Sequence, residues 1–112
     1  GIDRQTALRA LRAISISVQN EAYNHNTRGH WKLVSDSSVH GGFEVVSPFL
    51  HGEAGLEEAR AVATALDDAG ATANRSCGLH VHFDARDLTA GDIHTIVRRY
   101  ARHEAEIDAF MP

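Results

Sequence analysis

Hydrophobic and polar residues follow two different periods along this chain. Asp3 precedes a stretch in which Ala7, Leu8 and Leu11 share one helical face, which predicts a short helix capped by the aspartate. Residues 14–18 then alternate apolar and polar side chains, which is the period of a strand buried on one face only. The pattern therefore predicts a helix followed by a strand.

Two further strands are predicted in the first half of the chain. They run from Trp31 to Asp36 and from Phe43 to Ser47, after the polar, turn-rich residues 20–29. Residues 37–42 connect the two strands, so a hairpin is the simplest arrangement. Pro48 ends the second strand, because proline cannot donate a hydrogen bond to a sheet.

Helical periodicity returns after this hairpin. Gly70 lies where a left-handed residue would end a helix that starts at about residue 53. Residues 89–92, Thr-Ala-Gly-Asp, match a capping box at the start of a second long helix. The apolar stripe of the earlier helix contains Leu56, Ala59, Ala63 and Leu66, and that of the later helix contains Ile93, Ile96, Val97, Tyr100, Ile107 and Phe110.

The segment from Cys77 to Asp84 also alternates with a period of two. Its polar positions include His80 and His82, so the pattern predicts a strand with two imidazoles on the face opposite the core. Strands follow one another before each helix, without a regular strand-helix alternation. We therefore expect an α+β fold in which helices cover an antiparallel sheet.

Composition narrows the possible functions. A chain of 112 residues can fold around one core, which predicts a single domain over residues 1–112. A net charge of −4 without a basic block argues against a nucleic-acid surface, and no apolar run approaches the roughly 20 residues of a membrane span. The first residues lack the layout of a signal peptide, and the single cysteine, Cys77, cannot form an internal disulfide. We therefore expect a cytoplasmic protein.

Histidines and one carboxylate are the first candidates for chemistry. On a strand, His80 and His82 would lie about 7 Å apart, near enough to approach one assembly of metal and phosphate. The alternative is a solvated face of the sheet. Glu44 lies among apolar residues, where an ionised carboxylate is costly unless it is paired or coordinated. The alternative is an edge glutamate that faces water.

Two basic residues are further candidates. Lys32 could contact a phosphate, or it could form a salt bridge at a strand end. Arg75 could donate two hydrogen bonds to a phosphate, or it could lie on the surface before the next strand. Cys77 fits a small packing residue better than a nucleophile, because no base is identifiable beside it.

Three segments, in this order, resemble the amidoligase family, a branch of the glutamine synthetase and glutamate–cysteine ligase fold. They are residues 31–38, Trp-Lys-Leu-Val-Ser-Asp-Ser-Ser, residues 44–48, Glu-Val-Val-Ser-Pro, and residues 77–82, Cys-Gly-Leu-His-Val-His. The resemblance runs from about Tyr23 to Pro112. Its strongest part, residues 78–82, is similar to the Gly-Met-His-x-His stretch of glutamine synthetases. The resemblance implies that the chain folds as part of a glutamine-synthetase-like catalytic domain.

The resemblance also implies roles for these residues. In the family, the first histidine binds a divalent metal near ATP and the second contacts phosphate, which assigns His80 to the metal and His82 to the nucleotide. Glu44 becomes a metal-binding or substrate-binding carboxylate. Lys32 and Arg75 are candidates for binding the phosphates of ATP because of their own chemistry and not because of the resemblance. The implied reaction is ATP-dependent amide formation through an acyl phosphate, with Mg²⁺ or Mn²⁺. Its partners would be small-molecule or peptide carboxylates and amines.

Two segments of the family pattern are not found in these residues. Family members have a strand with a Glu-x-Glu pair just upstream of the position of Gly1, and an arginine-containing segment downstream. We therefore expect this chain to be a fragment of a larger ligase domain that catalyses little alone. A sheet without that first strand would expose an edge that could pair with a second copy of the chain.

Two other functions stay open at this stage. Residues 80–84, His-Val-His-Phe-Asp, also fit the His-x-His-x-Asp string of hydrolases in which zinc activates water. Alternatively, a ligase-like sheet could serve as a binding or assembly module without catalysis. Tight zinc binding with hydrolytic turnover would favour the first, and self-association would favour the second.

Overall fold

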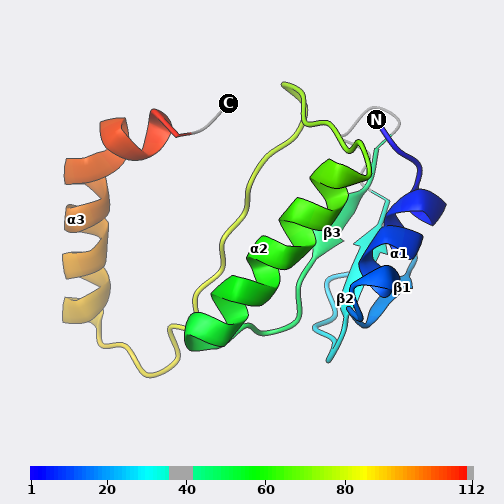
Figure 1. Cartoon of the computed structure of the whole chain (residues 1–112). Coiled ribbons are helices and arrows are strands. Elements are labelled where there is room, and N and C mark those ends of the chain that lie inside the picture. The colour runs from blue at the N-terminus through cyan, green and yellow to red at the C-terminus, as the bar shows by residue number, and fades with distance from the viewer. Residues whose placement is uncertain (36–41, 111–112) are drawn as a thin grey trace. The chain divides into compact units, whose positions relative to one another are not determined.

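A computed structural model describes residues 1–35 and 42–110 of the chain. The elements are α1 (Arg4–Ala13), β1 (Val18–Asn20), β2 (Trp31–Val34), β3 (Glu44–Val46), α2 (Gly52–Asp68) and α3 (Ala90–Asp108), as Figure 1 shows. The predicted α+β class is confirmed. The chain groups into two units, Gly1–Cys77 and Gly78–Pro112, and each is described by itself. A single domain over residues 1–112 stays a prediction.

The predicted helix ends are confirmed. Asp3 accepts a hydrogen bond of 2.7 Å from the Thr6 amide at the start of α1. Gly70 has a φ of 87° and ends α2 in the left-handed conformation. Thr89 and Asp92 form a complete capping box at the start of α3.

The strand predicted at residues 14–18 begins later than expected. Ser15 has a φ of 64°, and the amides of Ser15 and Ile16 each donate 3.0 Å hydrogen bonds, to the carbonyls of Arg12 and Leu11 respectively. This pattern is a Schellman motif, so the residues expected to open the strand instead end α1. Strand β1 therefore starts at Val18.

The sheet is mixed, which corrects the prediction of an antiparallel sheet. Its order is β1-β2-β3, and β2 pairs with β3 in antiparallel fashion, as expected. Strand β1, however, runs parallel to β2, with Val18 opposite Trp31. Strand β1 has only three residues, and the connection of residues 21–30 is long enough to return to its beginning. Strand β2 therefore runs in the same direction as β1. Residues 36–41, which include Asp36 and most of the predicted hairpin connection, lie outside the described residues.

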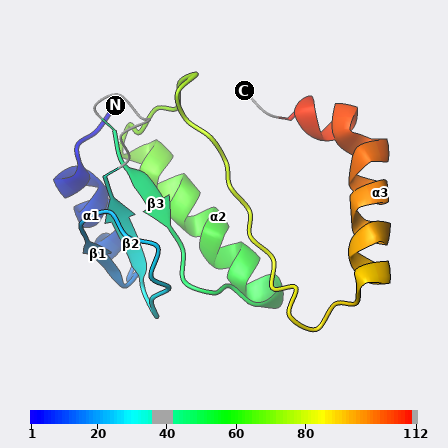
Figure 2. The same cartoon turned by 180° about the vertical axis from the view of Figure 1, so that it is seen from behind.

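Helices α1 and α2 cover one face of this sheet, as the two opposite views of Figures 1 and 2 show. The hydrophobic side chains of both helices pack there against those of the strands. The Trp31 indole also donates a hydrogen bond of 2.5 Å to Glu58 on α2, which ties that helix to β2. The buried cluster consists of Ala7, Leu8, Leu11, Val18, Trp31, Leu33 and Val62.

The other face of the sheet, here called the loop face, follows from the register. Lys32 lies opposite Val46, and Val34 lies opposite Glu44, and cross-strand partners point to the same side. Because side chains alternate along a strand, these four residues point away from Leu33 and the helices.

The strand predicted for Cys77–Asp84 is absent from the structure, which describes all of these residues without a strand. The alternating apolar side chains Leu79, Val81 and Phe83 are exposed by 68%, 63% and 87%. Alternation indicates a strand only where a neighbouring strand supplies hydrogen bonds, and none of the described strands pairs with this segment.

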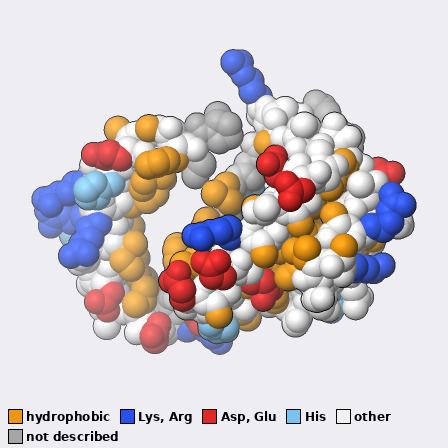
Figure 3. All heavy atoms as spheres, in the orientation of Figure 1, with side chains coloured by type: hydrophobic (Ala, Val, Ile, Leu, Met, Phe, Trp, Pro, Cys, Tyr) orange, Lys and Arg blue, Asp and Glu red, His pale blue; other side chains and the backbone are white. Residues whose placement is uncertain are grey.

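Helix α3 is amphipathic and contains no buried residue. Hydrophobic side chains gather along one side of it, and arginine and histidine side chains along another (Figure 3). In the described part of the chain, no helix combines the length and apolar character needed to cross a membrane.

The core gives a direct test of the fold. Leu33 is fully buried between the sheet and the helices, so Leu33→Ala should lower the free energy of unfolding by about 2–5 kcal/mol. Ile14, which is 43% exposed, serves as the matched control, and Ile14→Ala should cost less than about 1 kcal/mol. Urea denaturation followed by Trp31 fluorescence would measure both, and equal losses would contradict this packing.

Candidate functional site

The loop face of the sheet carries two of the predicted site residues. Glu44 and Lys32 lie on paired strands and are diagonal neighbours, because Glu44 opposes Val34 and Lys32 opposes Val46. Such diagonal positions lie about 7–8 Å apart, within reach of long side chains. The structure therefore places on one face of the sheet two predicted site residues that are 12 positions apart in the sequence.

The ammonium group of Lys32 is bound by the loop that connects β1 to β2. The residue is only 3% exposed, and its Nζ donates hydrogen bonds of 3.0 and 2.8 Å to the backbone oxygen and Oδ1 of Asn24, and of 2.8 Å to the backbone oxygen of Asn26. An ammonium group has three N–H donors, so these bonds employ all of them. A phosphate contact by Lys32 stays a prediction, and it would require some of these bonds to be exchanged.

Glu21 is the second residue, after Lys32, around which this loop is organised. Its carboxylate accepts a hydrogen bond of 3.0 Å from Asn24, lies 3.0 Å from His30 Nε2 and pairs with the Arg28 guanidinium at 3.1 Å. The side chain is only 14% exposed. The His30 imidazole and the Arg28 guanidinium lower the pKa of Glu21 to about 2. Glu21 therefore remains ionised at neutral pH and organises the loop around itself.

Glu21 was not among the residues predicted to form a site. It belongs to a polar, turn-rich stretch, where a carboxylate is expected to face water. The available signal was that Arg28 and His30 follow within ten positions on the same connection, which the loop folds back onto Glu21.

A polar pocket of about 540 Å³ opens beside this centre. It is formed by the end of β1 and by the loop that follows, within the first unit. The residues that line it are Gln19, Glu21, Ala22, Tyr23, Asn24, Asn26, Arg28 and His30.

Glu44 is half-buried, and no salt bridge to it is found among the described residues. Arg75 lies on a tight turn after α2 and is exposed. Asn74 holds that turn together, because its Oδ1 accepts hydrogen bonds of 2.8 and 2.7 Å from the amide and hydroxyl of Ser76. Arg75 is therefore presented to solvent, as either of its predicted roles requires.

His80 and His82 belong to the second unit, whereas Glu44, Lys32 and Arg75 belong to the first. Both histidines are exposed and lie in irregular backbone instead of on the predicted strand. The His80 imidazole folds back over Gly78, since a Cβ placed on that glycine would lie 3.4 Å from His80 Nε2. The metal and phosphate roles of these histidines stay predictions.

Asp84, the third residue of the His-x-His-x-Asp string, is bound by Arg86. The guanidinium contacts both carboxylate oxygens, with Nη2 at 2.6 Å from Oδ2 and Nε at 2.9 Å from Oδ1. These bonds lower the pKa of Asp84 to about 2. The carboxylate is therefore engaged locally, and the geometry does not present it as a ligand for zinc.

The donor types of the predicted metal site suit Mg²⁺ or Mn²⁺, since Glu44 offers carboxylate oxygens and His80 an exposed imidazole. Within residues 1–35 and 42–110, however, no three histidine, cysteine, aspartate or glutamate side chains come together to hold an ion. A metal role for Glu44 and His80 is therefore a proposal.

The Glu21 centre makes the stability of the loop dependent on pH. The pKa of Glu21 in the folded chain, about 2, lies below the value of 4.5 expected when unfolded. Its stabilising effect is therefore complete above pH 4.5 and is lost as the pH falls from about 4.5 towards 2. Urea denaturation followed by Trp31 fluorescence should show this loss, and Glu21→Gln should remove most of it.

Asp84→Asn is the matched control for this experiment. Asp84 has a similarly low pKa but lies in the second unit, so this variant should keep the acid sensitivity reported by Trp31. If Glu21→Gln retained the full pH dependence of the wild type, the loop would not be held by this carboxylate.

Comparison with known proteins adds one finding to this geometry. The model of a family described as "putative amidoligase enzyme" matches residues 1–112. No curated protein and no solved structure matches the chain. The family match spans the loop face of the first unit and the histidines of the second, which were the segments of the sequence resemblance. This chain belongs to the amidoligase family.

Proposed function

We propose that this chain is the part of an ATP-dependent carboxylate–amine ligase that binds nucleotide and substrate. The observation that carries the proposal is the amidoligase match over residues 1–112. The geometry supports it in one respect, because Glu44 projects from the sheet face that α1 and α2 leave uncovered. A half-buried carboxylate on this face can take part in binding or chemistry, which a glutamate in the helix-covered core could not.

The proposed reaction proceeds in two steps. A carboxylate oxygen of the acid substrate attacks the γ-phosphorus of ATP, which forms an acyl phosphate and releases ADP. The amine nitrogen then attacks the acyl carbon, so a C–N bond forms, inorganic phosphate leaves and the nitrogen loses a proton. In such transfers the protein mainly positions the reactants and stabilises charge on oxygen.

Each candidate residue has a role in this proposal. Glu44 and His82 would contact the reacting groups, with His82 on a phosphate oxygen. Arg75 would donate a forked pair of hydrogen bonds to phosphate, since its guanidinium is exposed on a turn. Lys32 would join them only if a bound phosphate replaced its present loop contacts.

Glu44 and His80 are the proposed ligands of a divalent ion, Mg²⁺ or Mn²⁺. Such an ion would neutralise charge on the triphosphate. The residues of the chain would contribute the oxygen and nitrogen donors. The substitution Glu44→Gln would replace the carboxylate with an amide of nearly the same shape and would remove one negative charge. The proposed setting is the cytoplasm, where ATP is available and a lone Cys77 would stay reduced.

Calorimetric titration of ATP in the presence of Mg²⁺, and then of Mn²⁺, tests the proposal. The wild-type chain should bind ATP only with metal, and the double variant His80→Ala with His82→Ala should bind at least about tenfold more weakly, because charge-assisted contacts are lost. Glu44→Gln should weaken metal-dependent binding to a similar extent.

His51→Ala is the matched control. His51 is an exposed histidine that precedes α2 and makes no side-chain capping bond, so its removal should leave ATP affinity unchanged. Circular dichroism would establish that every variant remains folded. Affinity that is unchanged in the double variant, or that is independent of metal, would contradict the proposed roles, and a wild type that does not bind ATP would favour a non-catalytic module.

A further inference from the structure

The pocket beside the β1–β2 loop has no part in the ATP contacts proposed above. It lies entirely within the first unit and is lined mostly by polar side chains. It is an open surface depression of about 540 Å³ and not an enclosed cavity. A lining made mostly of polar residues offers hydrogen bonds to a small polar or charged ligand.

The charges around this pocket favour an anion. Among the residues that line the pocket, Arg28 carries one positive charge and Glu21 carries one negative charge. The Glu21 carboxylate is also occupied, since Asn24, Arg28 and His30 all contact it. The negative charge of the lining is therefore neutralised within the loop, whereas part of the Arg28 guanidinium stays exposed and can bind an anion.

The hydrogen-bond donors have a geometry that suits a carboxylate. Arg28 uses Nε and Nη2 to bind Glu21, and its side chain is still 40% exposed at the pocket. Tyr23 is positioned by His25, with 3.0 Å between its hydroxyl oxygen and Nε2 and with the two rings 5.0 Å apart in an edge arrangement. Gln19 lies on the pocket wall at the end of β1 and is exposed. Guanidinium, hydroxyl and amide groups all donate to carboxylate oxygens.

The location connects this pocket with the proposed chemistry. Gln19 lies opposite Lys32 in the register of β1 and β2, and Lys32 shares the loop face with Glu44. The loop is fixed to that face by the Lys32 hydrogen bonds to Asn24 and Asn26, both of which line the pocket. A ligand held here would lie on the side of the sheet that carries the candidate catalytic carboxylate.

We propose that the β1–β2 loop pocket binds a carboxylate group of the acid substrate, with Arg28, Tyr23 and Gln19 as its contacts. The assignment of the ligand as a substrate rests on the proposed ligase function. The exposed part of the Arg28 guanidinium favours the acid over the amine as the substrate bound at this loop. A dicarboxylate could place one carboxylate here and direct the other along the loop face.

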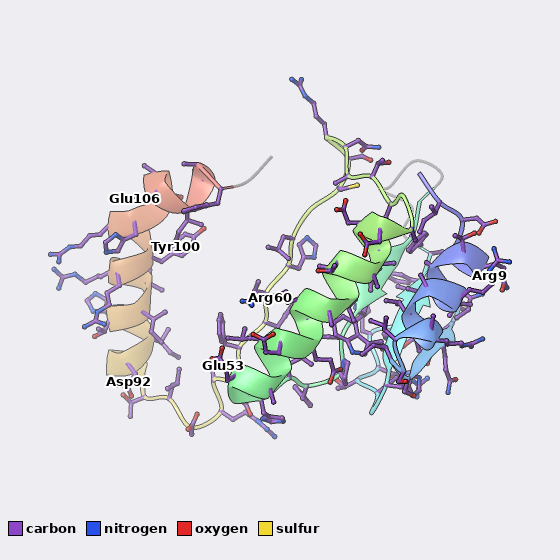
Figure 4. All side chains as sticks on the ribbon, viewed as in Figure 1. Arg9, Glu53, Arg60, Asp92, Tyr100 and Glu106 are labelled. Atoms are coloured by element: carbon purple, nitrogen blue, oxygen red, sulfur yellow. The ribbon has the colours of Figure 1, made fainter. Side chains whose placement is uncertain are left out.

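Titration with succinate, without ATP or metal, tests this inference on the full chain. Succinate should bind to the wild type, and Arg28→Gln should weaken binding by at least about tenfold, because a charge-assisted bond is lost. Succinamide has nearly the same shape without charge and should not bind. Arg9→Gln is the matched control, because Arg9 lies on the exposed side of α1 and does not line the pocket (Figure 4).

A second variant separates ligand contact from loop structure. Arg28→Gln also removes a partner of Glu21, whereas Gln19→Ala leaves the Glu21 contacts in place. We expect Gln19→Ala to weaken succinate binding several-fold while Trp31 fluorescence and stability stay those of the wild type. Succinate affinity that is unchanged in both variants, equal affinity for succinamide, or displacement of succinate by equimolar inorganic phosphate would overturn the inference.

The failure of this inference can be distinguished from failure of the proposed function. Succinate binding that depends on Arg28, in a chain that does not bind ATP, would support the pocket and contradict the ligase. ATP binding that depends on His80 and His82, in a chain without succinate binding, would support the ligase and overturn the pocket.

Discussion

The buried ammonium group of Lys32 is the interaction on which the arrangement of the loop face depends. An ammonium group is stable inside a protein only when hydrogen bonds replace its water, and here three oxygens of Asn24 and Asn26 do so. Because Lys32 projects from the central strand, these bonds fix the β1–β2 loop over one side of the sheet. Glu21 then completes the loop through Arg28 and His30. The buried Lys32 and the partly buried Glu21, two charges of opposite sign that the loop satisfies with hydrogen bonds, thus shape its pocket.

The two faces of the sheet have different roles: one packs against the helices, and the other carries candidate site residues. Trp31, Leu33 and Val45 turn towards α1 and α2 and contribute to the core, whereas Lys32 and Glu44 occupy the intervening positions. A carboxylate such as Glu44 would be costly on the helix side and is accommodated on the other. The free edge of β1 is also modified, because the Val18 carbonyl accepts a hydrogen bond of 3.2 Å from Arg12. A strand added at this edge would compete with Arg12 for that acceptor. The predicted pairing of two copies through a sheet edge would therefore have one backbone hydrogen bond fewer at β1.

Local sequence signals were reliable where the interactions are local. Asp3, Gly70 and Thr89 mark helix ends as predicted, because caps depend on residues three or four positions apart. The Schellman turn at Ser15 was missed, since a serine gives no sign of a positive φ and residues 14–18 alternate like a strand. Likewise, alternation around His80 suggested a strand, but a strand also needs a hydrogen-bonded neighbour.

The sequence by itself determined the α+β class, the helices and their caps, the β2–β3 pairing and the membership of the amidoligase family, because these depend on periodicity and on short motifs. Only the tertiary structure decided that β1 runs parallel to β2, that Lys32 is buried beneath a loop, and that Glu21 is a structural centre. Those features depend on where a polar loop folds back. The bonds of Lys32 and Glu21 join residues that periodicity does not relate, so their partners became identifiable only once the chain had closed on itself.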